Sequence, residues 1–169
     1  MTDLAVPEPA GPVRPGLGEA LRGFVRMSIA DKLCLAAAWP LLGLSALTVR
    51  LIAFKRFAPL LGEKLGPVGC VPLAGEAQEA RARTIRRAVR RAARISPWRN
   101  DCLPQAVTAA VLCRFAQVPV TTHLGVRLGG VKPMEAHAWT CAGRVAVSGG
   151  EGFSEWTPVQ CFAALVRRS

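Results

Sequence analysis

The chain has 169 residues, 51% of them hydrophobic, so it is long and apolar enough for a folded domain with a buried core. This composition excludes a disordered or fibrous protein. The 22 lysines and arginines outnumber the 11 acidic residues and give a net charge of +11. Such an excess predicts an acidic partner, whether a peptide or protein, an anionic membrane surface or a nucleic acid.

The number and spacing of the cysteines and histidines limit the kinds of site that the chain can form. The chain has two histidines, and its six cysteines form no CxxC pair, so we expect no metal site, no cofactor and no disulfide framework. Unpaired, scattered thiols predict a reduced, cytoplasmic protein. Any catalysis by an imidazole must use His123 or His137. The six cysteines are Cys34, Cys70, Cys102, Cys113, Cys141 and Cys161.

The N-terminal part predicts a tail and then an apolar helical region. Residues 1–18 are rich in proline, glycine and acidic residues and indicate a disordered tail rather than a secretory signal. The uncharged run from Leu33 to Val49 is interrupted by Pro40 and Gly43. This interruption favours a buried pair of core helices; membrane contact and a membrane span are the alternatives.

A linker and a basic helix come next. Residues 60–75 contain several glycines and prolines and predict a linker, so we expect a helical N-terminal region over 19–75 and a second part over 76–169. Residues 76–95 predict a helix with glutamates near its start and seven arginines along it. We interpret the arginines as a solvated face; docking of an acidic partner is the alternative, and RNA binding is disfavoured because no aromatic residue is interleaved. The positions left for packing are Ala80, Ile85, Ala88, Val89, Ala92 and Ala93.

The segment that begins at Ser96 carries the most chemical content. After Cys102, apolar residues recur at 103, 106, 107, 110 and 111, the spacing of one helix face. Asn100 or Asp101 can cap this helix, and Pro104 is tolerated in its first turn. Cys102 is therefore expected at a helix N-terminus, where the positive end of the dipole stabilises a thiolate nucleophile. The alternative is a small buried hydrophobic residue.

Strand patterns follow this helix. Strands are predicted over 118–128, 135–141 and 144–148, with a turn at Ala142-Gly143 and a final helix over 158–168. His137 shares a strand face with Trp139. Helices, a cysteine-bearing helix and then an antiparallel sheet with a histidine give an α+β fold. This order, with cysteine before histidine, is that of thiol enzymes of the papain and transglutaminase type.

Three motifs resemble one group within this type. CLPQAVTAAVLCRF, HLGVRLGG and EAHAWTCAGRVAVSGGEGF are similar to the transglutaminase-like maturation peptidases of lasso-peptide biosynthesis. The family pattern has a catalytic Cys-Leu at a helix start, an LGV strand and an AHAW motif. Here these fall on Cys102-Leu103, Leu124-Gly125-Val126 and Ala136–Trp139. The resemblance covers residues 96–158 and implies a cysteine-bearing helix on a small antiparallel sheet, preceded by a helical region.

The resemblance also implies roles for individual residues. Cys102 would attack the leader–core peptide bond and form a thioester, and His137 would transfer the proton to the leaving amine. A core histidine is the alternative for His137, and His123 matches nothing in the pattern. The family's aspartate is missing: a turn at Ala142-Gly143 would place Ser148 opposite His137. We expect Glu151 to orient the imidazole, with Ser148 or a backbone carbonyl as the alternative and Glu155 as a surface charge.

The partners implied by the resemblance are a precursor peptide, a separate leader-recognition protein and an asparagine-synthetase-like lasso cyclase. Nucleic acid is not expected, and the basic helix and the apolar segment 33–54 are candidate docking surfaces, the latter also for peripheral membrane contact. Two other functions stay open. The Cys102–His137 pair could transfer an acyl group to an amine, or the chain could be a non-catalytic scaffold of the maturation complex.

Overall fold

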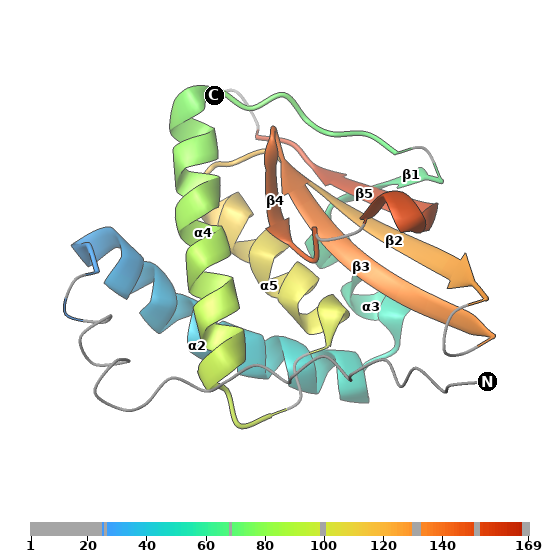
Figure 1. Cartoon of the computed structure of the whole chain (residues 1–169), viewed down its shortest axis with the longest axis horizontal. Coiled ribbons are helices and arrows are strands. Elements are labelled where there is room, and N and C mark those ends of the chain that lie inside the picture. The colour runs from blue at the N-terminus through green and yellow to red at the C-terminus, as the bar shows by residue number, and fades with distance from the viewer. Residues whose placement is uncertain are drawn as a thin grey trace, which may run out of the picture.

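The computed structural model describes residue 25 and residues 27–67, 69–98, 101–129, 133–150 and 153–166. This part of the chain contains α-helices, two short 3-10 helices and an antiparallel sheet (Figure 1). The α-helices are α2 (Ile29–Leu51), α3 (Phe54–Phe57), α4 (Glu76–Ile95) and α5 (Cys102–Phe115). The 3-10 helices are η1 (Ala58–Leu61) and η2 (Phe153–Glu155), and the strands are β1 (Glu63–Gly66), β2 (Val120–Leu128), β3 (Met134–Ala142), β4 (Val145–Ser148) and β5 (Thr157–Ala164).

The elements form three layers. The strand order is β1-β5-β2-β3-β4, with every neighbouring pair antiparallel. Helix α5 lies against β2, β3 and β4 on one face of the sheet, and α4 packs beside it (Figure 1). Helix α2 packs on α4 and α5, so these two helices separate it from the sheet. The predicted α+β class is confirmed.

Helix α5 is largely apolar because the sheet covers one of its sides and other helices cover another. Ala109 and Cys113 pack into a cluster with the sheet residues Val120 and Val147. On another side, Val107 and Ala110 pack against a second cluster that holds Phe57, Leu61 and Phe162. A helix covered on both sides needs no polar face, which explains why its sequence shows little amphipathic pattern.

Helix α2 corrects the expectation for residues 33–49. The segment forms one helix that continues through Pro40, not a pair of core helices, and its hydrogen-bonded N-cap is Ser28. Only Ala38, Leu42 and Ser45 of this helix are buried. Most of its large apolar side chains stay exposed, so only one side of the apolar run packs in a core cluster.

The predicted basic helix is confirmed with the expected bounds, as α4. Four of the six expected packing residues are buried, Ile85, Ala88, Val89 and Ala92. Ala80 is exposed and Ala93 is half-buried, whereas Ala82 is buried and was not expected.

The C-terminal element is a strand, and the predicted helix over 158–168 is wrong. Strand β5 pairs with β2 on one side and β1 on the other, so its backbone groups are used in the sheet. The helical spacing of Val159, Phe162 and Ala163 is accidental, because β5 is an interior strand and both of its faces are buried near its end. Strand β1, which pairs with β5, lies within the predicted linker. Residues 63–66 of that linker therefore belong to the sheet. The boundary near residue 75 stays a prediction.

The β3–β4 hairpin has a different register from the predicted one. Its turn is Gly143-Arg144, since Ala142 pairs with Val145, and Gly143 has a positive φ of 55°. An irregularity between Thr140 and Cys141 then brings Thr140 opposite Ser148. Ser148 therefore does not pair with His137, contrary to the sequence prediction.

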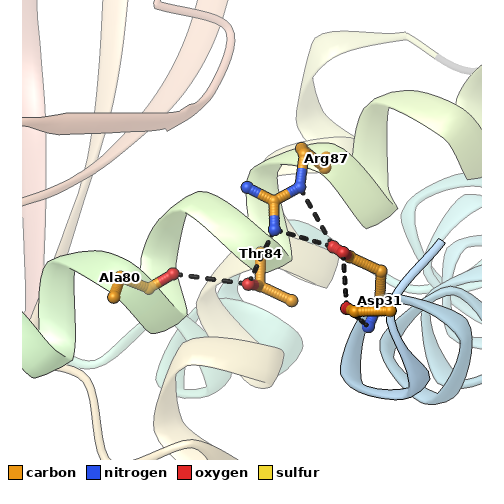
Figure 2. A network of polar contacts seen from close by, with 5 residues as sticks. Asp31, Ala80, Thr84 and Arg87 are labelled. Carbon is orange, nitrogen blue, oxygen red and sulfur yellow. Dashed lines mark hydrogen bonds and ion pairs between the residues drawn. The ribbon is translucent and has the colours of Figure 1, made fainter.

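A polar network fastens α2 to α4 (Figure 2). The Arg87 Nε and Nη2 atoms donate to Asp31 Oδ1 at 3.0 and 2.8 Å. Arg87 Nη2 also donates to the Thr84 hydroxyl, and Ser28 donates to Asp31 Oδ2 at 2.7 Å. The Ser28 hydrogen bond and the Arg87 guanidinium hold the pKa of Asp31 below its ordinary value of 3.8.

Replacement of Asp31 by asparagine is expected to lower the free energy of unfolding at neutral pH by about 1 kcal/mol or less, because Arg87 is half-exposed. A lowered carboxyl pKa stabilises the fold fully above the unfolded value of 3.8 and is lost as pH falls through the folded value. Urea unfolding of wild type and Asp31→Asn at several pH values measures this. The difference should shrink toward acid pH, whereas Glu63→Gln, on an exposed carboxylate, should leave the curve unchanged; a constant Asp31 difference contradicts the account.

Candidate active site

Cys102 is the first residue of α5. Its N-cap, Asp101, makes no side-chain capping hydrogen bond, and the thiol is half-buried. The first N–H groups of a helix have no partner within it and carry partial positive charge. The predicted placement at a helix start is confirmed, and it puts the thiol where a negative charge is stabilised.

Helix α5 and strand β3 run in the same direction where they pack together. Thr140 on β3 donates to the carbonyl of Ala106, and further along α5 Ala109 packs in one cluster with Ala142. The helix and β3 thus advance in the same direction. Going back one turn from Ala106 reaches Cys102, and going back a similar distance along β3, about 6 Å, reaches residues 137–138.

A cavity of 260 Å³ connects the two elements. It is lined by His137 from β3, by Gln105 one turn after Cys102, and by Arg86 and Arg90 from α4. The residues from Ala146 to Gly150 complete the lining. Among the described residues, β4 pairs with β3 only from Thr140 to Ala142. At His137, β3 is therefore paired with β2 on one edge, and its other edge has no paired strand. This open edge lets the imidazole and α5 line one cavity.

The imidazole of His137 has a defined tautomer. Its Nε2 atom lies 2.8 Å from the carbonyl oxygen of Gly149, and a carbonyl can only accept a hydrogen bond. Nε2 therefore carries the proton and donates it. In the neutral ring this leaves Nδ1 as the basic nitrogen, the atom that can take a proton from a thiol.

Aromatic rings hold the imidazole in place from both sides. The His137 ring stacks on Trp156 with centroids 4.9 Å apart, and on Trp139 at 6.0 Å. Trp139 in turn stacks on His123, and Arg127 lies over the Trp156 ring at 4.7 Å. The ring of His137 is thus fixed within a column, which restricts it to the orientation that its hydrogen bond requires.

Two glycines make room for this arrangement. Gly125 pairs with His137 across β2 and β3, and a Cβ there would lie 2.7 Å from Trp139 and 3.1 Å from Trp156. Gly149 has a φ of 61°, and a Cβ there would lie 2.5 Å from the Ala138 carbonyl and 3.1 Å from His137 Nε2. Any side chain at 149 would disturb the imidazole directly.

The sequence analysis named several candidates for the group that orients the imidazole of His137, and the structure distinguishes those that it describes. Ser148 is buried and lines the cavity, but its hydroxyl has no hydrogen-bond partner in the described part of the chain. Glu155 is exposed and pairs with Arg127. Glu151 lies outside the described residues, so its role stays a prediction. The group that contacts the imidazole is the Gly149 carbonyl, the backbone alternative of the sequence analysis.

Burial raises the pKa of four of the other five thiols. It raises the pKa of Cys113 to about 12 and those of Cys141 and Cys161 to about 11, and it also raises the pKa of Cys34. These four thiols stay protonated at neutral pH. Cys70 is partly exposed but lies 3.8 Å from Cys161, away from α5.

His123 is a core histidine in this structure. It is 4% exposed, stacks on Trp139, and its pKa is lowered by burial. It is therefore neutral near physiological pH. Within the described residues, no cluster of three or more His, Cys, Asp or Glu side chains could hold a metal ion.

Cys102 begins α5 and His137 lies near the middle of β3, and in the described part of the chain the thiol and the imidazole share no hydrogen bond. Such bonds are often long in enzymes without substrate and tighten when the substrate binds. The arrangement can deprotonate a thiol at a helix start and return the proton to a leaving group.

Comparison with known families decides the superfamily. The profile described as the transglutaminase-like superfamily matches residues 45–164, which is most of the chain and includes Cys102 and His137. The chain belongs to the transglutaminase-like superfamily. No curated protein and no solved structure matches it. This transglutaminase-like fold is typically that of a cysteine peptidase or an acyltransferase, and the predicted fold class is thereby confirmed.

Sequence reasoning missed three parts of this site. Trp156 and Gly149 were not singled out, and Gln105 was seen only as part of a motif. The glycine pair at 149–150, just after a predicted strand, was the available signal for a close backbone approach. Nothing in the sequence marks Trp156 as a neighbour of His137, because the contact depends on the path of the chain before β5.

Gly149→Ala is expected to slow the reaction of this transglutaminase-like site by about 10- to 100-fold, because the added methyl group displaces the imidazole from its orienting carbonyl. The matched control is Gly129→Ala, a glycine that also has a positive φ, 77°, but has open space around its Cβ position. Backbone strain alone should cost Gly129→Ala stability and not rate. Equal losses of rate in the two folded variants would show that Gly149 does not position His137.

Proposed function

We propose that this transglutaminase-like protein is a cysteine endopeptidase that removes the leader from a ribosomally made lasso-peptide precursor. The observation that supports the proposal is that Cys102 begins α5, while His137 on β3, with its Nε2 bound to Gly149, lines a cavity together with Gln105 of α5. Family membership supports thiol chemistry of the peptidase or acyltransferase kind. The motifs around both residues support the finer assignment.

The proposed reaction has two stages. Nδ1 of His137 accepts the proton of the Cys102 thiol as sulfur attacks the scissile carbonyl, and the imidazolium then protonates the leaving amine. This forms a thioester with one peptide fragment and releases the other. Water, deprotonated by the same imidazole, attacks the thioester and frees the second fragment and the thiol.

The negatively charged oxygen of the tetrahedral intermediate requires hydrogen-bond donors near the start of α5. The N–H of Cys102 has no helical partner and is the proposed oxyanion donor. Gln105 lines the same cavity as His137, and its side-chain amide is a candidate for the second donor. Glu151 remains the proposed carboxylate that stabilises the imidazolium, in addition to the Gly149 carbonyl.

Two surfaces near the site fit a peptide with acidic residues. Arg86 and Arg90 line the His137 cavity and favour a substrate carboxylate there. A groove of 610 Å³ runs between α2 and the start of α5, lined by Leu47, Trp98 and Pro104 among others. An extended peptide lying across the α5 start can therefore meet an apolar groove on one side and cationic side chains on the other.

The alternative thiol reaction is acyl transfer to an amine, which uses the same thioester and differs only in the attacking group. A separate leader-recognition protein and an asparagine-synthetase-like cyclase remain the proposed partners, and a cytoplasmic location remains a prediction. A non-catalytic scaffold is the other alternative. Product mass separates them: hydrolysis splits the precursor, transfer joins two molecules, and a scaffold leaves it intact.

Cys102→Ala is expected to abolish leader removal while the protein stays folded, because the variant lacks the nucleophile. The assay follows leader and core fragments of the precursor peptide by mass spectrometry in the presence of the leader-recognition protein. Cys141→Ala is the matched control: it removes a thiol from β3 that burial keeps protonated, and it should cleave at a rate close to wild type.

Cleavage by Cys102→Ala at the wild-type rate would contradict the assignment of the nucleophile. Loss of cleavage in Cys141→Ala, with the fold intact by circular dichroism, would show that the reactive thiol is elsewhere on the sheet. His137→Ala should reduce the rate by about 1000-fold or more.

A further inference from the structure

Helix α2 carries an uninterrupted apolar stripe on its outer side. The large side chains Leu33, Leu44 and Leu51 are 67%, 59% and 72% exposed. At 100° per residue, the stripe residues fall within an arc of about 80° along the whole helix, a length of roughly 33 Å. They are Ile29, Leu33, Ala36, Pro40, Leu44, Leu47 and Leu51, and all of them are exposed.

This stripe is unusual for the surface of a water-soluble domain. Single exposed leucines are ordinary, but a continuous apolar strip of this length marks an interaction surface. By length and composition, α2 is the one helix among the described residues that could cross a membrane, although core helices and signal sequences pass the same test. The stripe therefore has the composition of a lipid-facing surface.

Apart from Asp31, which is bonded to Arg87 on the packed side of the helix, the charged residues next to the stripe in the described part of the chain are basic. No charged residue lies between Lys32 and Arg50, and no acidic residue lies between Asp31 and Glu63. Arg50 lies in the last turn of the helix, and the exposed Lys55 and Arg56 follow in α3. A protein–protein interface typically has a rim of mixed polar residues around its apolar centre. Apolar residues flanked by cations instead fit an anionic lipid surface.

The opposite side of α2 fixes how the helix can meet a bilayer. Ala38 and Leu42 pack in a cluster with Ala88 and Ala92 of α4, and Asp31 is bonded to Arg87. A helix held along its length by protein cannot also be surrounded by lipid. It can lie in the plane of the interface, with the stripe toward the acyl chains and the rest of the molecule above it.

We propose that α2 is an interfacial membrane-docking helix that binds anionic phospholipid bilayers through its exposed apolar stripe and the basic residues Arg50, Lys55 and Arg56. The inference does not depend on the proposed peptidase activity. Leu47 and Arg50 also line the groove beside the start of α5, so docking places that groove at the membrane surface.

The test is co-sedimentation of the full chain with phosphatidylcholine vesicles that contain or lack phosphatidylglycerol. Wild type should bind the anionic vesicles, more weakly at high salt, and bind the neutral ones less. The double variant Leu44→Asn/Leu47→Asn should lose at least ~10-fold in partitioning, because two exposed leucines leave the stripe. The matched control is Phe115→Asn/Leu128→Asn, which removes two exposed apolar side chains elsewhere and should bind as wild type.

Each other outcome overturns the proposal. These are failure of wild type to sediment with anionic vesicles, equal losses in the stripe variant and the control, and a stable dimer by light scattering that the stripe variant abolishes. The last result would assign the stripe to a second copy of the chain. Thermal unfolding of both double variants checks the fold, and exposed positions are expected to tolerate asparagine.

Discussion

The position of the candidate nucleophile Cys102 depends on the burial of α5 between the sheet and the other helices. Its middle is built from small side chains that let β3 and α2 approach closely, and the Thr108 hydroxyl lies 3.0 Å from that of Ser45 on α2. A helix packed on all sides cannot slide or rotate without loss of contacts throughout the core. Its first residue is therefore fixed relative to β3. In this transglutaminase-like fold, the position of Cys102 is a consequence of core packing rather than of a flexible loop.

The imidazole is fixed by a different set of forces. Aromatic rings on both sides restrict its plane, and one backbone carbonyl determines which nitrogen carries the proton. A carbonyl dipole is a weaker partner for an imidazolium than a carboxylate, but it is rigidly positioned. A cysteine nucleophile depends less on such assistance than a hydroxyl, because a thiol is more acidic and intrinsically more nucleophilic.

Much of the fold was accessible from sequence because several segments have strong local patterns. The arginine-rich helix α4, the helix that begins at Cys102 and the strands β2 and β3 all occur where they were expected. Residues 158–168 were misassigned because β5, an interior strand, is buried on both faces over residues 161–164, so its second half lacks alternation. The hairpin register failed because the turn is one residue later and a bulge follows.

The parts of the candidate site that consist of reactive side chains could be predicted from the sequence. The part that consists of a backbone carbonyl could not. Cys102 and His137 stand out by residue type, helix position and motif. The hydrogen bond from His137 to Gly149 has no side-chain signature, and the hairpin that leads to Gly149 contains an irregularity between Thr140 and Cys141 that the sequence did not indicate. The exposure of α2 was also hidden, because an apolar run looks the same in sequence whether it faces a core or a bilayer.

The central claim is that Cys102 is a thiol activated by His137, and selective alkylation tests it most directly without any substrate. The native chain is treated with iodoacetamide at neutral pH, and the labelling rate of each of the six cysteines is mapped by mass spectrometry. The account predicts that Cys102 is labelled first and that His137→Ala slows its labelling by ~10-fold or more. Faster labelling of Cys70 or any other cysteine, or an unchanged Cys102 rate in His137→Ala, would contradict it.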